Sequence, residues 1–451
     1  MQPPVIVVPG ITASTLRDLY PMDPNTVWST ILNKEYDRIA LHPDDLRYER
    51  DEPARVLADR LFGVPYANFI AELRHDLADH HDRPVPVFPF PYDWRLPLAQ
   101  VQAQLTAFIG EVVERTRLMR HYHKDGYGAA PRVDLVGHSM GGLIITGCLA
   151  AGAGVGLIRK VATVATPFRG SFEAVLKVAV GTAELGPGPS NSREREVARL
   201  TPSLYHLIPS YEDAVIADRA AWRDLFRVSA WQPSVLATIG EYIRLFGLEP
   251  ASSRSGRQDQ ARGILAGMLK AAGEHRATVE DFRLRDARLE PDDWLVIVGV
   301  GEETRTALRV VDDGRDNPFF DLDSAQRRNG YPGGRRSPDD GVVEQPWETG
   351  DGTVPYFGAK PSFIDAARIV ALCDADFGYW ELRDRVLQGV AGLHGMLPTM
   401  NVVPKLIAAH LHGKAGQPGR AHAGLWGRRA PDLPPGEAWR PPIRGLRERV
   451  A

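Results

Sequence analysis

One serine in the chain has the surroundings of an enzymatic nucleophile. Ser139 stands at the centre of a Gly-His-Ser-Met-Gly segment, after the apolar run Val133–Val136 and before Leu143–Ile145. This order predicts a buried strand, a tight turn and a buried helix, with the serine raised on the turn. The supporting residues that we expect around the turn and its pocket are Gly10, Gly137, His138 and Gly141.

An acid and an imidazole follow the serine in the chain. Asp351 lies between two glycines in a predicted turn, and His394 lies in a glycine-bounded loop ahead of the last helix. A nucleophilic serine needs an imidazole within hydrogen-bonding reach, and the imidazole needs a carboxylate to hold its tautomer. We therefore predict Ser139, Asp351 and His394 as a catalytic triad. The competing carboxylates are Asp93, for which an ion pair with Arg95 is favoured, and more weakly Asp374 and Asp376.

Two backbone amides are predicted to stabilise an oxyanion. The β-branched run Val5–Val8 indicates a buried strand, and Pro9-Gly10-Ile11 follows it directly. The loop after an early strand supplies one amide of an oxyanion hole, and the residue after the nucleophile supplies the other. We expect the N–H groups of Ile11 and Met140 in these roles.

These segments together resemble the lecithin:cholesterol acyltransferase family, a family of lipases and acyltransferases. The resemblance rests on segments in the family's order: Val5–Ile11, Phe90–Arg95, Gly137–Gly142, Ala165–Ser171, Gly350–Val354 with His394, and Trp28 with the residues after it. It implies a serine acyl hydrolase or acyltransferase that acts on lipid esters. Animal members have a disulfide in an early lid and a secretory signal. Residues 17–65 contain no cysteine, and we expect no secretory signal ahead of the strand that begins at Val5.

Alternation of apolar strands and helices predicts the fold class. We expect an α/β-hydrolase fold: a mostly parallel central sheet with helices on both faces and an inserted, mainly helical cap. The expected parts are a first core segment (1–171, with a lid-like insertion at about 17–65), a cap (172–291), a second core segment (292–412) and a basic, Pro/Gly/Arg-rich tail (413–451).

Three stretches carry more detailed expectations. Residues 19–60 are charged and indicate irregular structure, whereas helices are expected in the cap at about 174–183 and 214–226. The tail is too poor in apolar residues to fold alone, so we expect it to lie across the core as a solvated strap. Contact of this basic tail, or of the cap, with a membrane surface is the alternative.

The composition limits the possible partners and the compartment. A net charge of −3 over 451 residues gives no reason to expect nucleic acid as a partner, and no apolar run approaches the length of a membrane-spanning helix. The two cysteines, Cys148 and Cys373, are expected to be free thiols in a reducing compartment, with a disulfide as the minor alternative. We expect a cytoplasmic protein, because no signal peptide is recognised, and we expect no cofactor. We also expect no metal site, because the adjacent and alternate histidines lack carboxylate or cysteine neighbours.

The predicted function is that of a serine-dependent lipid ester hydrolase or O-acyltransferase with a covalent acyl-serine intermediate. Hydrolysis is the default, since water is always available as acceptor. An esterase for small soluble esters is the alternative within enzymes. A hydrolase-fold protein that only binds its ligand is the alternative outside them.

Overall fold

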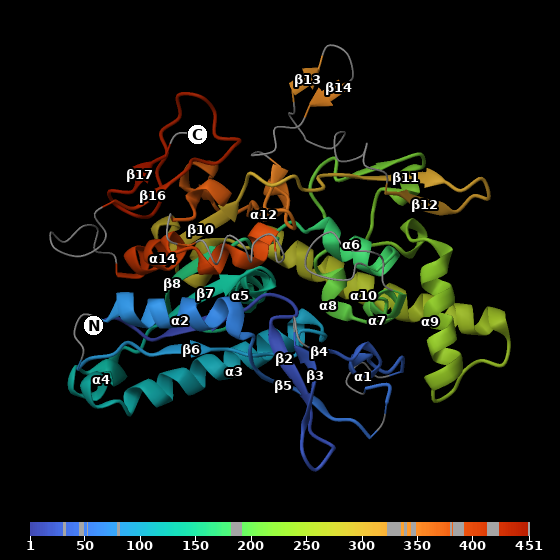
Figure 1. Ribbon diagram of the computed structural model, residues 1–451, viewed down its shortest axis with the longest axis horizontal. Helices are drawn as coiled ribbons and strands as arrows, with labels where there is room; N and C mark the ends of the chain where they lie inside the picture. The colour runs from blue at the N-terminus through green and yellow to red at the C-terminus, as the bar shows by residue number, and fades with distance from the viewer. Residues whose placement is uncertain are drawn as a thin grey trace.

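The computed structural model (Figure 1) describes most of the chain. The described residues are 1–29, 33–44, 49–51, 53–78, 82–181, 192–322, 335–337, 341–343, 349–378, 381, 392–412 and 424–449.

A parallel sheet forms the centre of the molecule. In the described part of the chain it has six strands in the order β15-β10-β8-β7-β1-β6, and every neighbouring pair is parallel. The strands are β1 (Val5–Val8), β6 (Val87–Pro89), β7 (Val133–His138), β8 (Ile158–Val164), β10 (Trp294–Gly299) and β15 (Val370–Leu372). The proline-containing strand β6 lies at one edge, where a missing N–H donor is tolerated.

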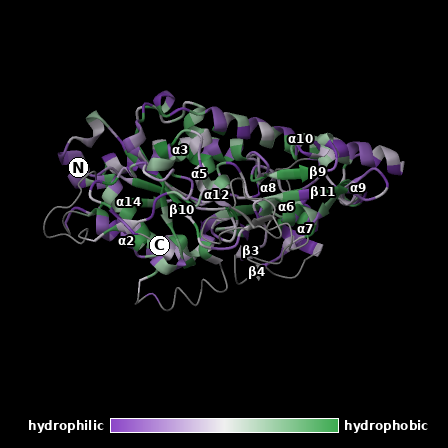
Figure 2. Ribbon diagram, turned by 90° about the horizontal axis from the view of Figure 1, so that it is seen from above, coloured by the Kyte–Doolittle hydropathy of each residue, from purple (hydrophilic) through white to green (hydrophobic). Residues whose placement is uncertain are grey.

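Helices cover both faces of this sheet. Alternate side chains of a strand point to opposite faces, so Val5 and Val7 join one hydrophobic cluster while Ile6 and Val8 join the other. The first cluster includes α2 (Gly63–Leu77) and α14 (Val402–His412), and the second includes α3 (Leu98–Arg117) and α5 (Met140–Ala150). In Figure 2 the hydrophobic colour is prominent around β10 and α5 in the middle of this part of the molecule, whereas α2 and α3 carry both colours. The predicted α/β-hydrolase fold class is thereby confirmed.

The early insertion contains more regular structure than its charged sequence indicates. A four-stranded antiparallel sheet forms there, in the order β4-β3-β2-β5, so the expectation of irregular structure over residues 19–60 was wrong in part. Its elements are β2 (Ser14–Asp18), β3 (Asn25–Ser29), β4 (Asn33–Lys34), α1 (Tyr36–Ile39) and β5 (Val56–Leu61). Charged side chains such as Arg60 point to solvent, and they obscure the alternation of a half-buried strand.

The segment between β8 and β10 is mainly helical, as expected. Its longer elements are α6 (Phe172–Ala179), α7 (Ser192–Ala198), α8 (Pro202–Tyr205), α9 (Pro233–Phe246) and α10 (Arg254–Asp281). The helix expected at 214–226 is instead the short strand β9 (Val215–Ala217) followed by a 3₁₀ turn. β9 pairs with β11 (Leu308–Asp312), which pairs with β12 (Pro318–Asp321), so the partner that makes this segment a strand comes from beyond β10.

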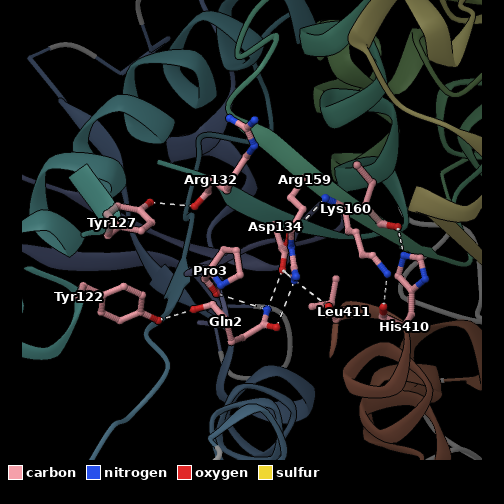
Figure 3. Close-up of polar contacts among 11 residues, drawn as sticks. Gln2, Pro3, Tyr122, Tyr127, Arg132, Asp134, Arg159, Lys160, His410 and Leu411 are labelled. Atoms are coloured by element: carbon pink, nitrogen blue, oxygen red, sulfur yellow. Dashed lines mark hydrogen bonds and ion pairs between the residues drawn. The ribbon is translucent and has the colours of Figure 1, made fainter. Parts of the chain in front are cut away.

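Polar contacts tie the elements together at the end of the sheet where β7 and β8 begin (Figure 3). The fully buried Asp134 accepts hydrogen bonds from Gln2 at 2.7 Å and from Arg159 Nε at 3.0 Å. Arg159 and Lys160 also donate to the carbonyls of Leu411 and His410, each at 2.7 Å. Cations therefore satisfy the last carbonyls of α14, which have no partner within the helix.

The described part of the C-terminal tail packs on the outer strand of the sheet. Its residues 424–449 include β16 (Trp426–Gly427) and β17 (Arg447–Glu448), which pair with each other. Arg428 pairs through its backbone with Ala371, and the indole N–H of Trp439 donates to the carbonyl of Ile369 at 2.8 Å. The remaining short elements are α4 (Arg120–Lys124), α12 (Tyr356–Ala359), β13 (Arg335–Ser337) and β14 (Gly341–Val343).

The structure also describes the state of the two cysteines, the hydropathy of the helices and the grouping of possible metal ligands. Cys148 and Cys373 are both free thiols. Among the residues described here, no helix is long and apolar enough to cross a membrane, and no group of three or more His, Cys, Asp or Glu side chains is arranged to hold a metal ion.

Buried and half-buried histidines make the fold sensitive to acid. Burial lowers the pKa of His275 and His410 from 6.5 to about 3, and it lowers the pKa of His206 in the same direction. Between about pH 6.5 and 3 the unfolded chain therefore binds more protons than the folded one, so the free energy of unfolding falls as the pH decreases. Each such histidine contributes up to about 1.4 kcal/mol per pH unit.

We expect urea unfolding to show a clearly lower free energy of unfolding at pH 5 than at pH 7. His410→Gln should reduce the difference between the two pH values, whereas the same change at the exposed His75 should leave it unchanged. Equal stability of the wild-type protein at pH 5 and pH 7 would show that burial does not keep these histidines neutral.

Candidate active site

The predicted site residues gather where the parallel strands of the sheet end. Ser139 directly follows β7, and Gly10 lies two residues after β1. Asp351 packs against Gly299, the last residue of β10, so closely that a Cβ atom on this glycine would come within 2.5 Å of the Asp351 Cβ. Because carboxyl ends of parallel strands share one edge of a sheet, residues from distant parts of the chain meet there.

Ser139 occupies a strained turn between β7 and α5. Its backbone has φ 53° and ψ −128°, a conformation that residues with a side chain rarely adopt. The turn also requires two glycines, because a Cβ at Gly137 would lie 2.7 Å from the amide nitrogen of Gly142, and one at Gly141 would collide with the carbonyl of Val8. These are the glycines that the sequence predicts as support for the turn.

Ser139, His394 and Asp351 form a continuous chain of hydrogen bonds. His394 Nε2 lies 2.9 Å from Ser139 Oγ, and His394 Nδ1 lies 2.8 Å from Asp351 Oδ2. All three residues are buried, with exposed fractions of 6%, 5% and 1% for the serine, histidine and aspartate. The three residues that the sequence singles out are therefore in direct contact.

The second oxygen of Asp351 is held by its own turn. Asp351 Oδ1 accepts the amides of Thr353 at 3.0 Å and Val354 at 2.7 Å, so the carboxylate keeps one oxygen for the turn and presents the other to His394. Thr304 belongs to no motif of the sequence, yet its hydroxyl accepts the amide of Gly352 at 2.8 Å. The backbone amide of His394 also donates to the Asp351 carbonyl at 3.1 Å.

The two amides predicted for the oxyanion hole belong to Met140, directly after the serine, and to Ile11, in the loop after β1. Met140 is the first residue of α5, so its N–H has no carbonyl partner within the helix. Within the described part of the chain, the amide of Ile11 donates no hydrogen bond either. Gly10, which precedes Ile11, lies against Ser139: a Cβ on this glycine would come 2.9 Å from the Ser139 Cβ. Among the described residues, neither amide is therefore taken up by a backbone hydrogen bond, and the loop that precedes Ile11 contacts Ser139.

A second chain of hydrogen bonds lies behind the first. The hydroxyl of Tyr66 accepts the amide of Gly10 at 3.0 Å and lies 2.6 Å from His138 Nδ1, while His138 Nε2 lies 3.1 Å from the carbonyl of His394. Burial, and then the proximity of His394, lower the pKa of His138 to about 3, so this imidazole is neutral. The sequence analysis names His138 as a support residue but misses Tyr66. Tyr66 belongs to no recognised motif, and its position in α2 indicates only a buried core residue.

The other candidate carboxylates have different partners. Asp93 forms a two-point ion pair with the buried Arg95, at 2.9 Å to Nε and 2.7 Å to Nη2, as the sequence favours. Asp376 pairs with Arg428 and Arg449 of the tail. Asp374 is the first residue of the short 3₁₀ turn that ends in Asp376. Asp351 alone of these four contacts His394 in the described structure.

An apolar cavity of about 80 Å³ adjoins the predicted oxyanion loop. It lies between the early sheet, the loop after β1 and helices α7 and α8. Its lining residues are Ile11, Thr12, Trp28, Lys34, Tyr36, Ile39, Trp94, Lys177, Glu194, Val197, Ala198, Thr201 and Leu204. The indole of Trp28 donates to the carbonyl of Thr12 at 3.0 Å, which joins the early sheet to the loop. Met140, by contrast, has its side chain fully buried in the core.

The chain is similar to one protein family and to two solved structures. Residues 71–260 match the model of the lecithin:cholesterol acyltransferase family. The solved Tle4–Tli4 complex contains a chain that is 14% identical, with 91% of this chain and 97% of that chain covered and a TM-score of 0.52. The mature Bacillus licheniformis lipase BlEst2 is 11% identical, with 91% and 92% covered and a TM-score of 0.33. No curated protein sequence matches the chain.

The match covers α3, the turn around Ser139 and most of the mainly helical segment after β8. The likeness to the first solved structure extends over nearly the whole chain and shows a common fold. The chain has an α/β-hydrolase fold, and its residues 71–260 match the lecithin:cholesterol acyltransferase family.

Proposed function

We propose that this protein is a serine-dependent lipid ester hydrolase or O-acyltransferase, with Ser139 as nucleophile, His394 as general base and acid, and Asp351 as the carboxylate of the triad. The observation that carries the proposal is the buried, unbroken contact of the three side chains at 2.9 Å and 2.8 Å. The family relationship supports action on an ester.

The proposed reaction has two halves. Ser139 Oγ attacks the carbonyl carbon of the ester while His394 Nε2 takes the proton of the hydroxyl. The amides of Ile11 and Met140 stabilise the oxyanion that forms. His394 then protonates the leaving alcohol, which departs as the carbon–oxygen bond of the ester breaks and leaves an acyl-serine. Water, or a second alcohol, loses its proton to His394 and attacks this ester, and Ser139 regains its proton as the acyl group leaves.

The proposed substrate is an ester with an apolar acyl chain. The cavity beside Ile11 supports this, because its walls are mostly apolar and include two tryptophans. A hydrocarbon chain gains about 0.8 kcal/mol for each buried methylene, so such a pocket favours a longer chain over acetate. Hydrolysis remains the default outcome, and transfer to an alcohol is the alternative for the second half of the reaction.

Removal of the nucleophile tests the whole assignment. We expect Ser139→Ala to lower turnover of a p-nitrophenyl ester by about 10⁶-fold while the thermal unfolding transition remains. A fluorophosphonate probe should label the wild-type protein stoichiometrically at Ser139 and should not label the variant. Folded wild-type protein without labelling would instead support the non-catalytic binding protein.

The choice of carboxylate has a separate test. Asp351→Asn preserves the shape of the side chain but favours the wrong imidazole tautomer, so we expect turnover to fall by about 10⁴-fold. Asp93→Asn should instead lower the free energy of unfolding, by about 3 kcal/mol, because it weakens the ion pair of the buried Arg95. The assignment would be wrong if Asp93→Asn stopped turnover in a fully stable protein and Asp351→Asn did not.

The acyl pocket is tested with a series of esters of increasing chain length. Ala198 lines the cavity, and Ala198→Leu should narrow it. We expect a loss of about tenfold or more in kcat/KM for long-chain esters, with acetyl ester hydrolysis retained. Ala221→Leu, at an exposed position, is the matched control. A wild-type preference for acetyl esters, together with no activity on phospholipid vesicles, would support the esterase for small soluble esters.

A further inference from the structure

We propose that Tyr66 and His138 are positioning residues, which hold the loop that carries His394 and the loop that carries the oxyanion amide in place relative to Ser139. The inference rests on the proposed function and extends it to two residues that do not touch the reacting atoms.

The hydrogen bonds between these residues have only one consistent direction. The carbonyl of His394 can only accept, so the neutral His138 ring carries its proton on Nε2 and leaves Nδ1 as an acceptor. The Tyr66 hydroxyl therefore donates to His138 Nδ1, and it accepts the amide of Gly10, which can only donate. Every donor and acceptor in this chain is therefore satisfied.

The chain joins three separate pieces of the site. Gly10 directly precedes Ile11, whose amide we assign to the oxyanion hole. His138 directly precedes Ser139, and its imidazole lies beside that of His394, with ring centroids 5.3 Å apart. Tyr66 comes from α2, an element that supplies no reacting group. A shift of any one piece must therefore break a buried hydrogen bond to another.

His394 is held at four points in consequence. Its ring contacts Ser139 and Asp351, its backbone amide donates to the Asp351 carbonyl, and its own carbonyl accepts from His138. Of these four contacts, the last connects the His394 backbone to the strand that carries the nucleophile. Since a displacement of about 1 Å can lower a rate by about 100-fold, this bond is expected to affect catalysis rather than binding.

The first experiment compares two buried tyrosines. Tyr66 and Tyr122 are 2% and 1% exposed, and each donates one hydrogen bond. The partner of Tyr122 is the carbonyl of Gln2, at 2.7 Å, which lies at the end of the sheet shown in Figure 3. Tyr66→Phe should lower kcat for a p-nitrophenyl ester between about 10- and 100-fold with KM nearly unchanged. Tyr122→Phe should lower stability but leave kcat within about twofold of wild type.

The second experiment separates the two nitrogens of His138. The amide nitrogen of a glutamine can occupy the position of Nε2, whereas that of an asparagine reaches only the position of Nδ1. His138→Gln should therefore retain the bond to the His394 carbonyl and most of kcat, while His138→Asn should lose kcat to the same extent as Tyr66→Phe.

Fluorophosphonate labelling of the wild-type protein distinguishes failure of the positioning role from failure of the proposed function. Labelling of the wild-type protein supports the proposed function. The positioning role is then wrong if Tyr66→Phe and Tyr122→Phe lose kcat equally or not at all. It is also wrong if His138→Gln retains no more kcat than His138→Asn. If the folded wild-type protein is not labelled, the proposed function fails and the positioning role fails with it.

Discussion

The strained backbone of Ser139 is the constraint on which the rest of the site depends. A residue at φ 53° and ψ −128° persists only where its surroundings leave no alternative. Those surroundings are a fully buried strand before it, a helix after it that is buried along nearly its whole length, and glycines that let α5 approach the end of β1. The same close approach brings the loop after β1 beside the serine, so the proposed nucleophile and the loop with the proposed oxyanion amide of Ile11 are positioned together.

The two large insertions meet the core at the loops of the site. Trp28 of the early sheet donates to the carbonyl of Thr12, next to Ile11. Ser171, which caps α6, donates to the carbonyl of Thr353 at 2.6 Å, within the turn that holds Asp351. The insertions also contact each other, where the amide of Leu248 donates to Asp44 at 2.6 Å. They therefore contribute to the geometry of the site as well as to the cavity beside it.

Charge is distributed differently at the two ends of the sheet. At the end where β7 begins, the buried Asp134 is compensated by Arg159 and by polar groups around it, and this cluster also anchors α14. At the end with Ser139, the buried His138 is neutral, and Asp351 is the carboxylate in contact with an imidazole. A carboxylate in a buried setting is well placed to stabilise the imidazolium that would form during the proposed reaction.

The sequence alone predicts the features that local physics requires. A turn as tight as that at Ser139 needs glycines at fixed spacing, and a sheet covered on both faces needs continuous apolar strands. The strained turn and the fold class can therefore be predicted from neighbouring residues. The order of Ser139, Asp351 and His394 along the chain predicts their roles for the same fold. Charged strands on a half-exposed sheet, such as β5, lose that signal because their pattern resembles a loop.

Only the tertiary structure decides which partners meet. Asp93, Asp376 and Asp351 are equivalent as residue types, and the contact of Asp351 with His394 distinguishes it from the others. Tyr66 has the sequence pattern of a core residue, and β9 becomes a strand because β11 lies beside it. His394 and Ser139 are 255 residues apart in the chain. Periodicity reports which face of an element is buried, but it contains no information on which distant residue that face will contact.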